Sequence, residues 1–333
     1  MRHLRRYPLL TALVAVLLFA AAACSSGGGK QEETQTATGG GGQVASTPRL
    51  KIAMVTHAVA GDTFWDIIQK GANAAASKDN VQFLYSNDPD AARQAQLVQT
   101  AIDQKVDGIA ITLAKPDALK DVIGKAIAAG IPVVTLNAGE NESPDYGALA
   151  HFGQNEEVAG EAAGEQLNKL GAKNAICVLQ EQGHVGLEAR CRGAAKTFSG
   201  KMENLFAQGA NLPQFQSTIT SKLQADKTID AVLTLGAPFA LAAVTSVKDA
   251  GSSAKVSTFD MNKDLVGALA EGQVQFAVDQ QPYVQGYLSV DSLWLYKTNG
   301  NVLGGGRPVF TGPAIVTTEM AKTIEPFADR GTR

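Results

Sequence analysis

Aromatic, amide and charged side chains recur in the polar segments that follow short apolar runs of this chain. A small polyhydroxy ligand needs this mixture, because aromatic faces cover its C–H surface while carboxylates, amides and a guanidinium satisfy its hydroxyls in a desolvated cleft. The residue types therefore favour ligand binding over bond-breaking chemistry. The residues concerned are Asp62, Phe64, Trp65, Asn137, Arg190, Phe239, Asp260 and Gln280.

Each of these residues also has a purely structural interpretation. Phe64 and Trp65 can be core residues at the start of a helix, and Arg190 can be a solvated helix residue. Asp260 can cap the helix that follows it. His57 is as well explained as a satisfied loop histidine as by ligand contact. Their shared position after strands, rather than any single residue, carries the binding hypothesis.

Enzyme signatures are absent from the sequence. It contains no G-x-S-x-G, no P-loop and no G-x-G-x-x-G after an expected strand, and four histidines leave little for acid–base chemistry. Glu181, Asp260 and Asp279 can form carboxylate pairs, but nothing in the sequence sets their separation. We expect no enzyme, no cofactor and no metal site, and an exported carbohydrate-acting enzyme is the less favoured alternative.

A repeating unit must position these side chains: a short apolar strand, a polar loop and an Ala-rich amphipathic helix. Strands that alternate with helices predict parallel sheets with helices on both faces. About ten such units exceed one open sheet, so we expect an α/β fold of two doubly wound lobes joined by a multi-strand hinge. The expected strands are Lys51–Thr56, Val81–Tyr85, Gly108–Thr112, Ile131–Leu136, Tyr146–Phe152, Ala175–Leu179, Glu203–Ala207, Ala231–Leu235, Val256–Phe259 and Val274–Val278.

The two lobes are expected to be similar, with the break between them near Phe152–Asn155. The first lobe comprises 50–153 plus 281–310, and the second comprises 154–280 plus 311–333. The short tail Pro308–Val316 can supply a last strand. In this layout the polar stretch Asp279–Gln281 before Pro282 is a crossover, and Gln280 becomes a contact near the hinge instead of a plain turn residue.

The first residues read as a targeting segment. A basic start, an apolar run and three alanines before Cys24 indicate a signal peptide over 1–23. Cys24 is then expected to be the lipidated first residue of a bacterial lipoprotein, although cleavage after an A-x-A site would leave it as an ordinary cysteine. Residues 24–49, rich in Gly, Ser, Thr and Gln, predict a flexible tether that stands the globular body off the membrane.

Composition and charge bound the function further. With 45% hydrophobic and 18% charged residues the chain is typical of a soluble globular protein. Loss of Arg2, Arg5 and Arg6 with the signal would lower the formal net charge from −3 to −6. This balance argues against a nucleic-acid partner.

Cys177 and Cys191 remain after Cys24. The first falls in an expected strand and the second in the following helix. In an exported protein an even pair favours a disulfide, and two buried free thiols are the alternative.

From Leu50 to Val316 the chain resembles the type I periplasmic sugar-binding proteins that feed ATP-driven import. The resemblance is carried by Thr63-Phe64-Trp65, Val133–Asn137, Glu188–Gly193, Thr258–Asp260 and Asp279–Pro282. It implies that Phe64 and Trp65 sandwich a sugar ring, and that Arg190, Asp260 and Gln280 contact its hydroxyls. It also places Asp62 and Thr112 where the family has ligand-facing residues.

Two departures from that family concern the ligand. The pair Asn137-Ala138 stands where pentose binders have Asp-Arg, and Gly236-Ala237 replaces a ligand-facing Asn. Replacing a charged group removes roughly 1.5–3 kcal/mol per hydrogen bond. We therefore expect a monosaccharide other than ribose, a deoxy sugar or a polyol.

The resemblance further implies a monomer that closes around its ligand and then docks on an ABC permease with its ATPase, at the extracytoplasmic face of the cell membrane. A receptor for a chemosensory or signalling partner would have the same site and stays an open alternative. A regulator of the lac-repressor type is disfavoured, since a signal and a Gly-rich tether stand where its DNA-binding domain would be.

Overall fold

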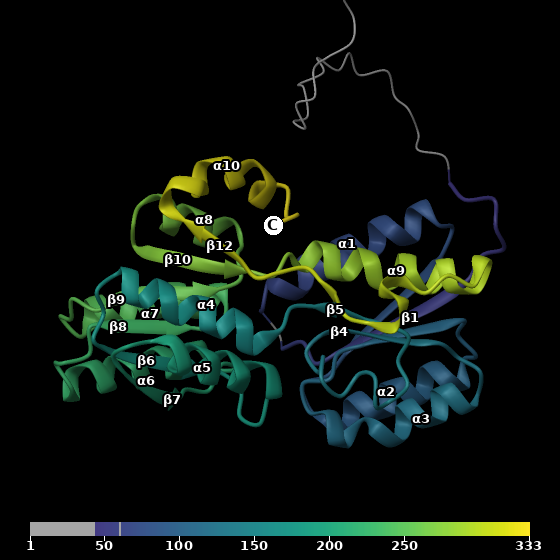
Figure 1. Cartoon of the computed structure of the whole chain (residues 1–333), viewed down its shortest axis with the longest axis horizontal. Helices are drawn as coiled ribbons and strands as arrows, with labels where there is room; N and C mark the ends of the chain where they lie inside the picture. Colours follow the sequence, from purple (N-terminus) through teal and green to yellow (C-terminus); the bar gives the residue numbers. More distant parts are fainter. Residues whose placement is uncertain (1–43, 60) are drawn as a thin grey trace, which may run out of the picture. The chain divides into compact units, whose positions relative to one another are not determined.

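The computed structural model describes residues 44–59 and 61–333, which form two six-stranded sheets, each covered by helices on both faces (Figure 1). The expected signal peptide, Cys24 and the first part of the expected tether lie outside the described residues. Within the described part of the chain, no helix combines the length and the apolar character needed to span a membrane. The expected fold class, two doubly wound α/β lobes, is confirmed.

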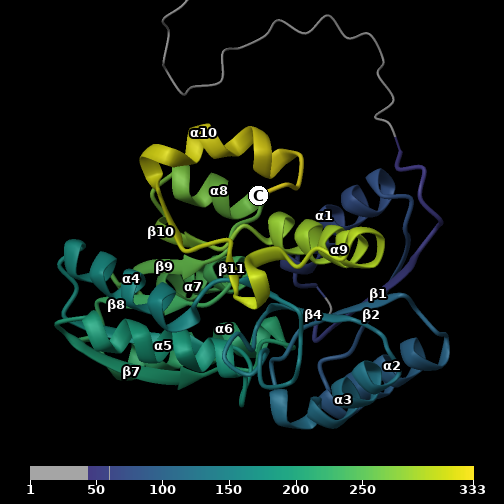
Figure 2. The ribbon, with the colours of Figure 1, turned by 45° about the vertical axis from the view of Figure 1, so that its right-hand side comes forward.

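The first sheet runs in the order β2-β1-β3-β4-β5-β11 and its paired strands are parallel. Side chains alternate across it: Ile52 and Met54 face α1 and α9, while Ala53 and Val55 face α2 and α3. Figure 2 shows the first pair of helices above this sheet and the second pair below it. The elements of this first lobe are β1 (Lys51–Thr56), α1 (Phe64–Lys78), β2 (Gln82–Asn87), α2 (Ala91–Asp103), β3 (Gly108–Ile111), η1 (Pro116–Ala118), α3 (Lys120–Ala128), β4 (Val133–Asn137), β5 (His151–Gly153), α9 (Pro282–Asn299), η2 (Leu303–Gly306) and β11 (Val309–Phe310).

The second sheet runs in the order β7-β6-β8-β9-β10-β12, with only β12 antiparallel to its neighbour. Helices α4 and α5 pack on one face, and α6, α7, α8 and α10 pack on the other. The elements of this second lobe are α4 (Glu156–Lys169), β6 (Asn174–Leu179), α5 (Val185–Thr197), β7 (Lys201–Phe206), α6 (Leu212–Ala225), β8 (Ala231–Thr234), α7 (Ala237–Asp249), β9 (Lys255–Phe259), α8 (Lys263–Ala270), β10 (Val274–Asp279), β12 (Ala314–Thr317) and α10 (Thr318–Asp329).

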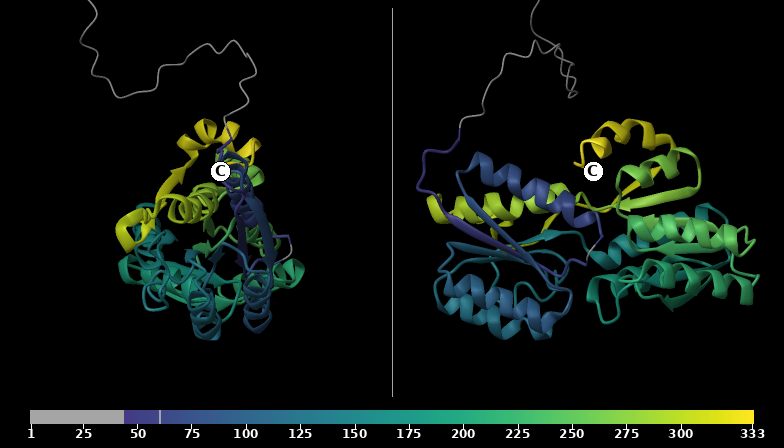
Figure 3. Two further views of the ribbon diagram at one scale, coloured as in Figure 1. Left: turned by 90° about the vertical axis from the view of Figure 1, so that its right-hand side faces the viewer. Right: turned by 180° about the vertical axis from the view of Figure 1, so that it is seen from behind.

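Both sheets have the same strand order, and in each the order reverses beside its first strand, β1 or β6. Ligands of such sheets bind at the carboxyl ends of the strands, next to that reversal. The chain passes between the sheets three times, after β5, after β10 and between β11 and β12 (Figure 3). The loops at the carboxyl ends are thus held by strands whose positions the sheets fix.

Three details differ from the sequence expectations. Pro308–Val316 forms two short strands in different sheets, because Thr311–Pro313 crosses between them and Pro313 has no N–H to donate. Tyr146–Phe152 is a strand only from His151 onward, since Gly147 takes a positive φ of 79° in a turn. Helix α10 was not expected, and it contains Pro326, a residue that usually ends helices.

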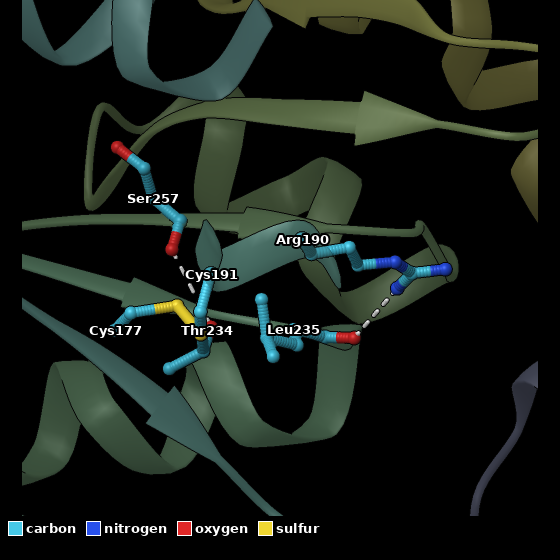
Figure 4. The surroundings of a disulfide bond; sticks show 6 residues. All are labelled: Cys177, Arg190, Cys191, Thr234, Leu235 and Ser257. Atoms are coloured by element: carbon cyan, nitrogen blue, oxygen red, sulfur yellow. Dashed lines mark hydrogen bonds between the residues drawn. A yellow bond between two sulfur atoms is a disulfide. The ribbon is translucent and has the colours of Figure 1, made fainter. Parts of the chain in front are cut away.

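The second lobe contains the disulfide favoured by the sequence. Cys177 in β6 and Cys191 in α5 are joined, with 5.8 Å between their Cα atoms (Figure 4). The bond ties α5 to the sheet one residue after Arg190. It therefore fixes the helix that carries the arginine of the candidate site.

Candidate functional site

A cavity of about 300 Å³ lies between the two lobes, at the carboxyl ends of both sheets. The first lobe contributes the segments after β1, β2 and β3 and the end of β4. The second lobe contributes the segments that follow β6, β7, β8, β9 and β10. Its lining is His57, Val59, Asp62, Phe64, Trp65, Pro89, Lys115, Asn137, Gln180, Glu181, Gln182, His184, Leu187, Arg190, Phe206, Gln208, Gly209, Ala210, Leu235, Gly236, Phe239, Asp260 and Gln280.

The structure brings together all the candidate binding residues at this cavity except Thr112. Thr112 is fully buried behind His57, where its Oγ1 lies 2.7 Å from Nδ1 of the imidazole and accepts from the His57 backbone N–H at 3.1 Å. Gln94 donates to the Thr112 carbonyl at 2.9 Å. The expected ligand contact at Thr112 is therefore not placed at the cavity wall; this residue orients His57.

An aromatic wall from the first lobe forms one side of the cavity. The ring centroids of Phe64 and Trp65 are 5.1 Å apart with an interplanar angle of 85°. His57 meets Trp65 edge-on at 4.8 Å. Phe64 and Trp65 stand at the start of α1, and Asp62 just before them accepts the Phe64 backbone N–H at 3.1 Å. Phe64 and Trp65 belong to the hydrophobic core, since each is only 6% exposed, and they also line the cavity.

Phe239 supplies an aromatic face from the second lobe. A Cβ on Gly236 would lie 3.1 Å from Cδ2 of Phe239, and one on Gly209 would lie 3.0 Å from its Cε1. Both distances are tight contacts, so these glycines make room for the ring. The replacement of a polar residue by Gly236 thus accompanies an apolar surface at this end of the cavity.

Two site residues sit in the left-handed backbone region. Asn137 has a φ of 65° and Asp260 a φ of 62°, at the carboxyl ends of β4 and β9. Asn and Asp tolerate this conformation better than other non-glycine residues. Gln281, next to Gln280, has a φ of 56° and starts α9. Such strained positions cluster at functional sites, because the surrounding structure must hold them.

Gln280 connects the lobes inside the site. Its Nε2 donates to Oδ1 of Asp260 at 2.7 Å, and its Oε1 accepts from Nδ2 of Asn137 at 3.2 Å. Gln285 in α9 donates to the same Oε1 at 2.8 Å. Gln280 is fully buried, so its hydrogen-bonding groups hold one residue from each lobe in place.

Arg190 is held by a carboxylate that the sequence analysis did not select. Its Nε and Nη2 donate to the two oxygens of Glu156 at 2.6 and 2.9 Å, a bidentate pair. Nη1 donates to the Leu235 carbonyl at 3.2 Å (Figure 4) and lies 3.5 Å from Oδ2 of Asp260. Burial lowers the pKa of Arg190, but Glu156 and Asp260 raise it by more, so the guanidinium stays charged.

His184 was also missed, although it lies between the expected strand Ala175–Leu179 and the candidate residue Arg190. It caps α5, and its Nδ1 accepts from the backbone N–H groups of Gly186 and Leu187 at 3.1 and 3.3 Å. Burial lowers its pKa well below the usual value, so the ring is neutral with its proton on Nε2. That proton is donated to Nε2 of His57 at 3.1 Å.

His57 and His184 form a chain of hydrogen bonds between the lobes. Burial and the charge of Lys115 lower the pKa of His57 to about 3, so it too is neutral. Potential ligand atoms of His57, His184 and Glu181 lie within 4.8 Å of one another. In this structure the Nδ1 of His184 accepts backbone N–H groups, and Lys115 forms an ion pair with Glu181 at 3.0 Å. Two of the three residues therefore already have partners.

Lys115 was not selected from the sequence, and Glu181 was considered there only as a possible member of a carboxylate pair. Their ion pair joins the lobes beside the backbone hydrogen bond from the Val185 N–H to the Ala114 carbonyl at 3.1 Å. Both fall in loops at strand ends, the signal that would have found them. A partly exposed lysine in a loop is otherwise unremarkable in sequence.

Comparison with known proteins gives the family. A model described as periplasmic binding protein domain matches residues 52–301. The chain is 26% identical over 277 residues to the xylose/arabinose-binding protein XylF of Sulfolobus acidocaldarius, covering 76% of this chain and 68% of that protein. It is 25% identical over 235 residues to the ribose import binding protein RbsB of Bacillus subtilis, covering 69% of this chain and 76% of that protein.

Solved structures agree with this. A carbohydrate transporter from Acidothermus cellulolyticus 11B, solved in complex with myo-inositol, is 54% identical with a TM-score of 0.85, covering 86% of this chain and all of that chain. A solute-binding protein from Burkholderia graminis, solved with D-arabinose, is 25% identical with a TM-score of 0.73, covering 81% of this chain and 96% of that chain. The chain therefore belongs to the periplasmic binding protein domain family, as a sugar-binding periplasmic protein of the ABC transporter type.

Proposed function

We propose that this protein captures a cyclic polyol or a monosaccharide between its lobes and delivers it to an ABC-type permease, acting as a monomer without chemical turnover. The observation that carries the proposal is the composition of the cavity wall. Phe64, Trp65 and Phe239 offer apolar faces, while Arg190 and Asp260 offer charged hydrogen-bonding groups. Flat rings with hydroxyls around their edge match such a wall.

Among the possible rings, an inositol is the best supported. The similar Acidothermus protein was solved with myo-inositol. In this chain Asn137 stands at the end of β4 and Gly236 at the end of β8, so neither position offers a charge to a pentose. The amide of Asn137 is already hydrogen-bonded to Gln280. A pentose that depends on charged partners at these two positions would lose them here, which costs affinity.

We predict that myo-inositol raises the melting temperature of the ligand-free protein and that ribose raises it far less. A ligand at a hundred times its Kd adds about 2.7 kcal/mol to the free energy of unfolding, or roughly 5–10 °C for a protein of this size. A thermal-shift screen over inositols, aldoses and acyclic polyols, followed by calorimetry, measures this. Strong stabilisation by ribose alone would contradict the inositol assignment, and a product of sugar turnover in mass spectrometry would favour an enzyme.

We also propose that Cys24 carries a lipid anchor at the extracytoplasmic face of the membrane. Replacing Cys24 by serine is expected to move the protein from the membrane fraction to the soluble exported fraction, since the anchor supplies membrane binding. Fractionation with immunodetection measures the distribution. Retention of the serine variant in the membrane fraction would show that the cysteine is not the anchor.

A further inference from the structure

The cavity holds more negative than positive charge. Carboxylates of Asp62, Glu181 and Asp260 line it, with the cations of Lys115 and Arg190. Lys115 and Glu181 neutralise each other across 3.0 Å. The net charge of the cavity then depends on Arg190 and on the carboxylates of Asp62 and Asp260.

Two of the three guanidinium nitrogens of Arg190 are paired with a carboxylate outside the cavity. Its bidentate contacts, at 2.6 and 2.9 Å, go to Glu156, which lies behind it and does not line the cavity. Asp260 is left with the longer 3.5 Å contact to the same guanidinium. One guanidinium therefore serves two buried carboxylates, and only one of them is closely paired.

Asp62 has no counter-charge of its own. It accepts one backbone N–H, from Phe64, and no ion pair among the described residues includes it. Burial is the main cause that raises the pKa of Asp62 to about 6 and that of Asp260 to about 7, and the carboxylates of Glu156 and Asp62 raise the pKa of Asp260 further. Both are thus costly to hold as anions in the empty cavity.

Building on the proposed polyol-binding function, we propose that the preferred ligand is a cyclic polyol in which an ammonium group replaces one hydroxyl and pairs with Asp62 or Asp260. An ammonium supplies the missing positive charge and donates three hydrogen bonds, whereas a hydroxyl supplies no charge. Uronates and phosphorylated sugars are disfavoured by the same excess of carboxylates. An amino-substituted inositol or an amino sugar fits.

The test compares matched ligand pairs by calorimetry on the ligand-free mature protein: scyllo-inosamine against scyllo-inositol, and glucosamine against glucose. N-acetylglucosamine serves as the uncharged amide control. In whichever pair the protein binds, the amine should bind about tenfold tighter than its neutral partner at about pH 7.5. This factor is the difference between a charge-assisted and a neutral hydrogen bond. N-acetylation should remove the advantage.

Acid should shrink the advantage too. As pH falls through about 7 and 6, Asp260 and then Asp62 gain protons in the empty protein, while the ligand ammonium stays charged. The charged groups around them are Arg190 on α5, Glu156 on α4, Asp66 on α1, and the Lys115–Glu181 pair. A tenfold preference at about pH 7.5 should therefore be largely lost at about pH 5.

Two variants locate the effect. D62N and D260N should each reduce the amine preference by several-fold or more. The matched control D121N, an exposed acid in the first turn of α3 outside the cavity, should keep it. Circular dichroism melting identifies any variant that fails to fold. In that case the comparison of each amine with its neutral partner in the wild-type protein still tests the inference.

The outcomes separate this inference from the proposed function. Neutral polyols that bind as tightly as their amines at about pH 7.5 overturn the inference and leave the proposed function intact. If no member of either pair binds while myo-inositol or another neutral sugar of the thermal-shift screen does, the inference is overturned and the proposed function stands. If nothing in that screen binds, the proposed function fails and the inference fails with it. An amine preference that survives both D62N and D260N also overturns the assignment to these carboxylates.

Discussion

Replacing Arg190 by alanine should weaken ligand binding by about a hundredfold or more, the expected cost of truncating a buried, charged hydrogen-bonding partner. Arg190 is 3% exposed and lines the cavity with Asp260. Its loss would also leave Glu156 and Asp260 buried with no cation beside them. Breaking a buried pair in this way costs about 3–5 kcal/mol of stability.

Binding and folding must therefore be measured separately in this variant. Calorimetry gives the affinity, and chemical denaturation gives the free energy of unfolding. A double variant, Arg190→Met with Glu156→Gln, removes the guanidinium together with its bidentate carboxylate. It should regain part of the lost stability without regaining affinity, because the ligand still lacks its arginine. Affinity restored in the double variant would mean that Arg190 serves only the fold.

Arg192 provides the matched control. It lies two residues later on α5, its side chain is 61% exposed, and its Nε pairs with Glu157 at 3.2 Å on the surface. Surface pairs contribute about 0–1 kcal/mol. Arg192→Ala should leave the affinity unchanged and the stability nearly so, and a large loss of binding there would undermine the special role given to Arg190.

Arg190 also shows how much of the site could be predicted from the sequence. Arg190 was placed among the ligand-facing residues because it lies in the segment that follows an expected strand. Parallel strands do bring such segments to one edge of the sheet. The alternation of strands and helices was enough to predict the two-lobe fold, because it is a local pattern that repeats along the chain. What a local pattern cannot give is the partner of a side chain.

Glu156 illustrates this limit. In sequence it is an acidic residue in the first turn of a helix capped by Asn155, where carboxylates are common because they favour the helix N-terminus. Its pairing with Arg190 joins residues 34 positions apart and follows only from the packing of α4 on α5. The hydrogen bond from His184 to His57, 127 positions apart and in different lobes, is equally invisible before the lobes are assembled.

Helix α10 and the split of Pro308–Val316 were missed for a different reason. Pro326 and Pro313 are residues that usually end helices and strands. Here Pro326 lies within α10, where Ala321 and Ile324 pack against the second sheet, and Pro313 lies between two strands of different lobes. Tertiary packing outweighs local preference at these positions.

Replacing Gly286 by alanine should lower the melting temperature by roughly 6–12 °C, the equivalent of about 3 kcal/mol of overpacking in a protein of this size. Gly286 in α9 faces α1 at a point where the helix backbones touch. A Cβ there would lie 2.0 Å from the Ile68 carbonyl oxygen, and a Cβ on Gly71 would lie 2.0 Å from the Tyr283 carbonyl oxygen. Backbone atoms cannot move aside as a flexible side chain can, so the helices must separate.

Gly124 in α3 is the matched control, because a Cβ there would meet no atom within 4 Å. Gly124→Ala should keep or raise the melting temperature, since alanine favours a helix by about 1 kcal/mol over glycine. Differential scanning fluorimetry of the two variants side by side makes the comparison. Equal melting temperatures would show that α1 and α9 can separate at little cost.

The Gly286 variant should also bind ligand more weakly, which a purely local defect would not explain. Helix α1 begins with Phe64 and Trp65, and α9 begins just after Gln280. Pushing the two helices apart therefore displaces the aromatic wall relative to the residue that links Asn137 to Asp260. Misplacing binding groups by about 1 Å can cost a hundredfold in function. Unchanged affinity in a destabilised Gly286→Ala protein would mean that the two helix ends are held by the sheets and not by each other.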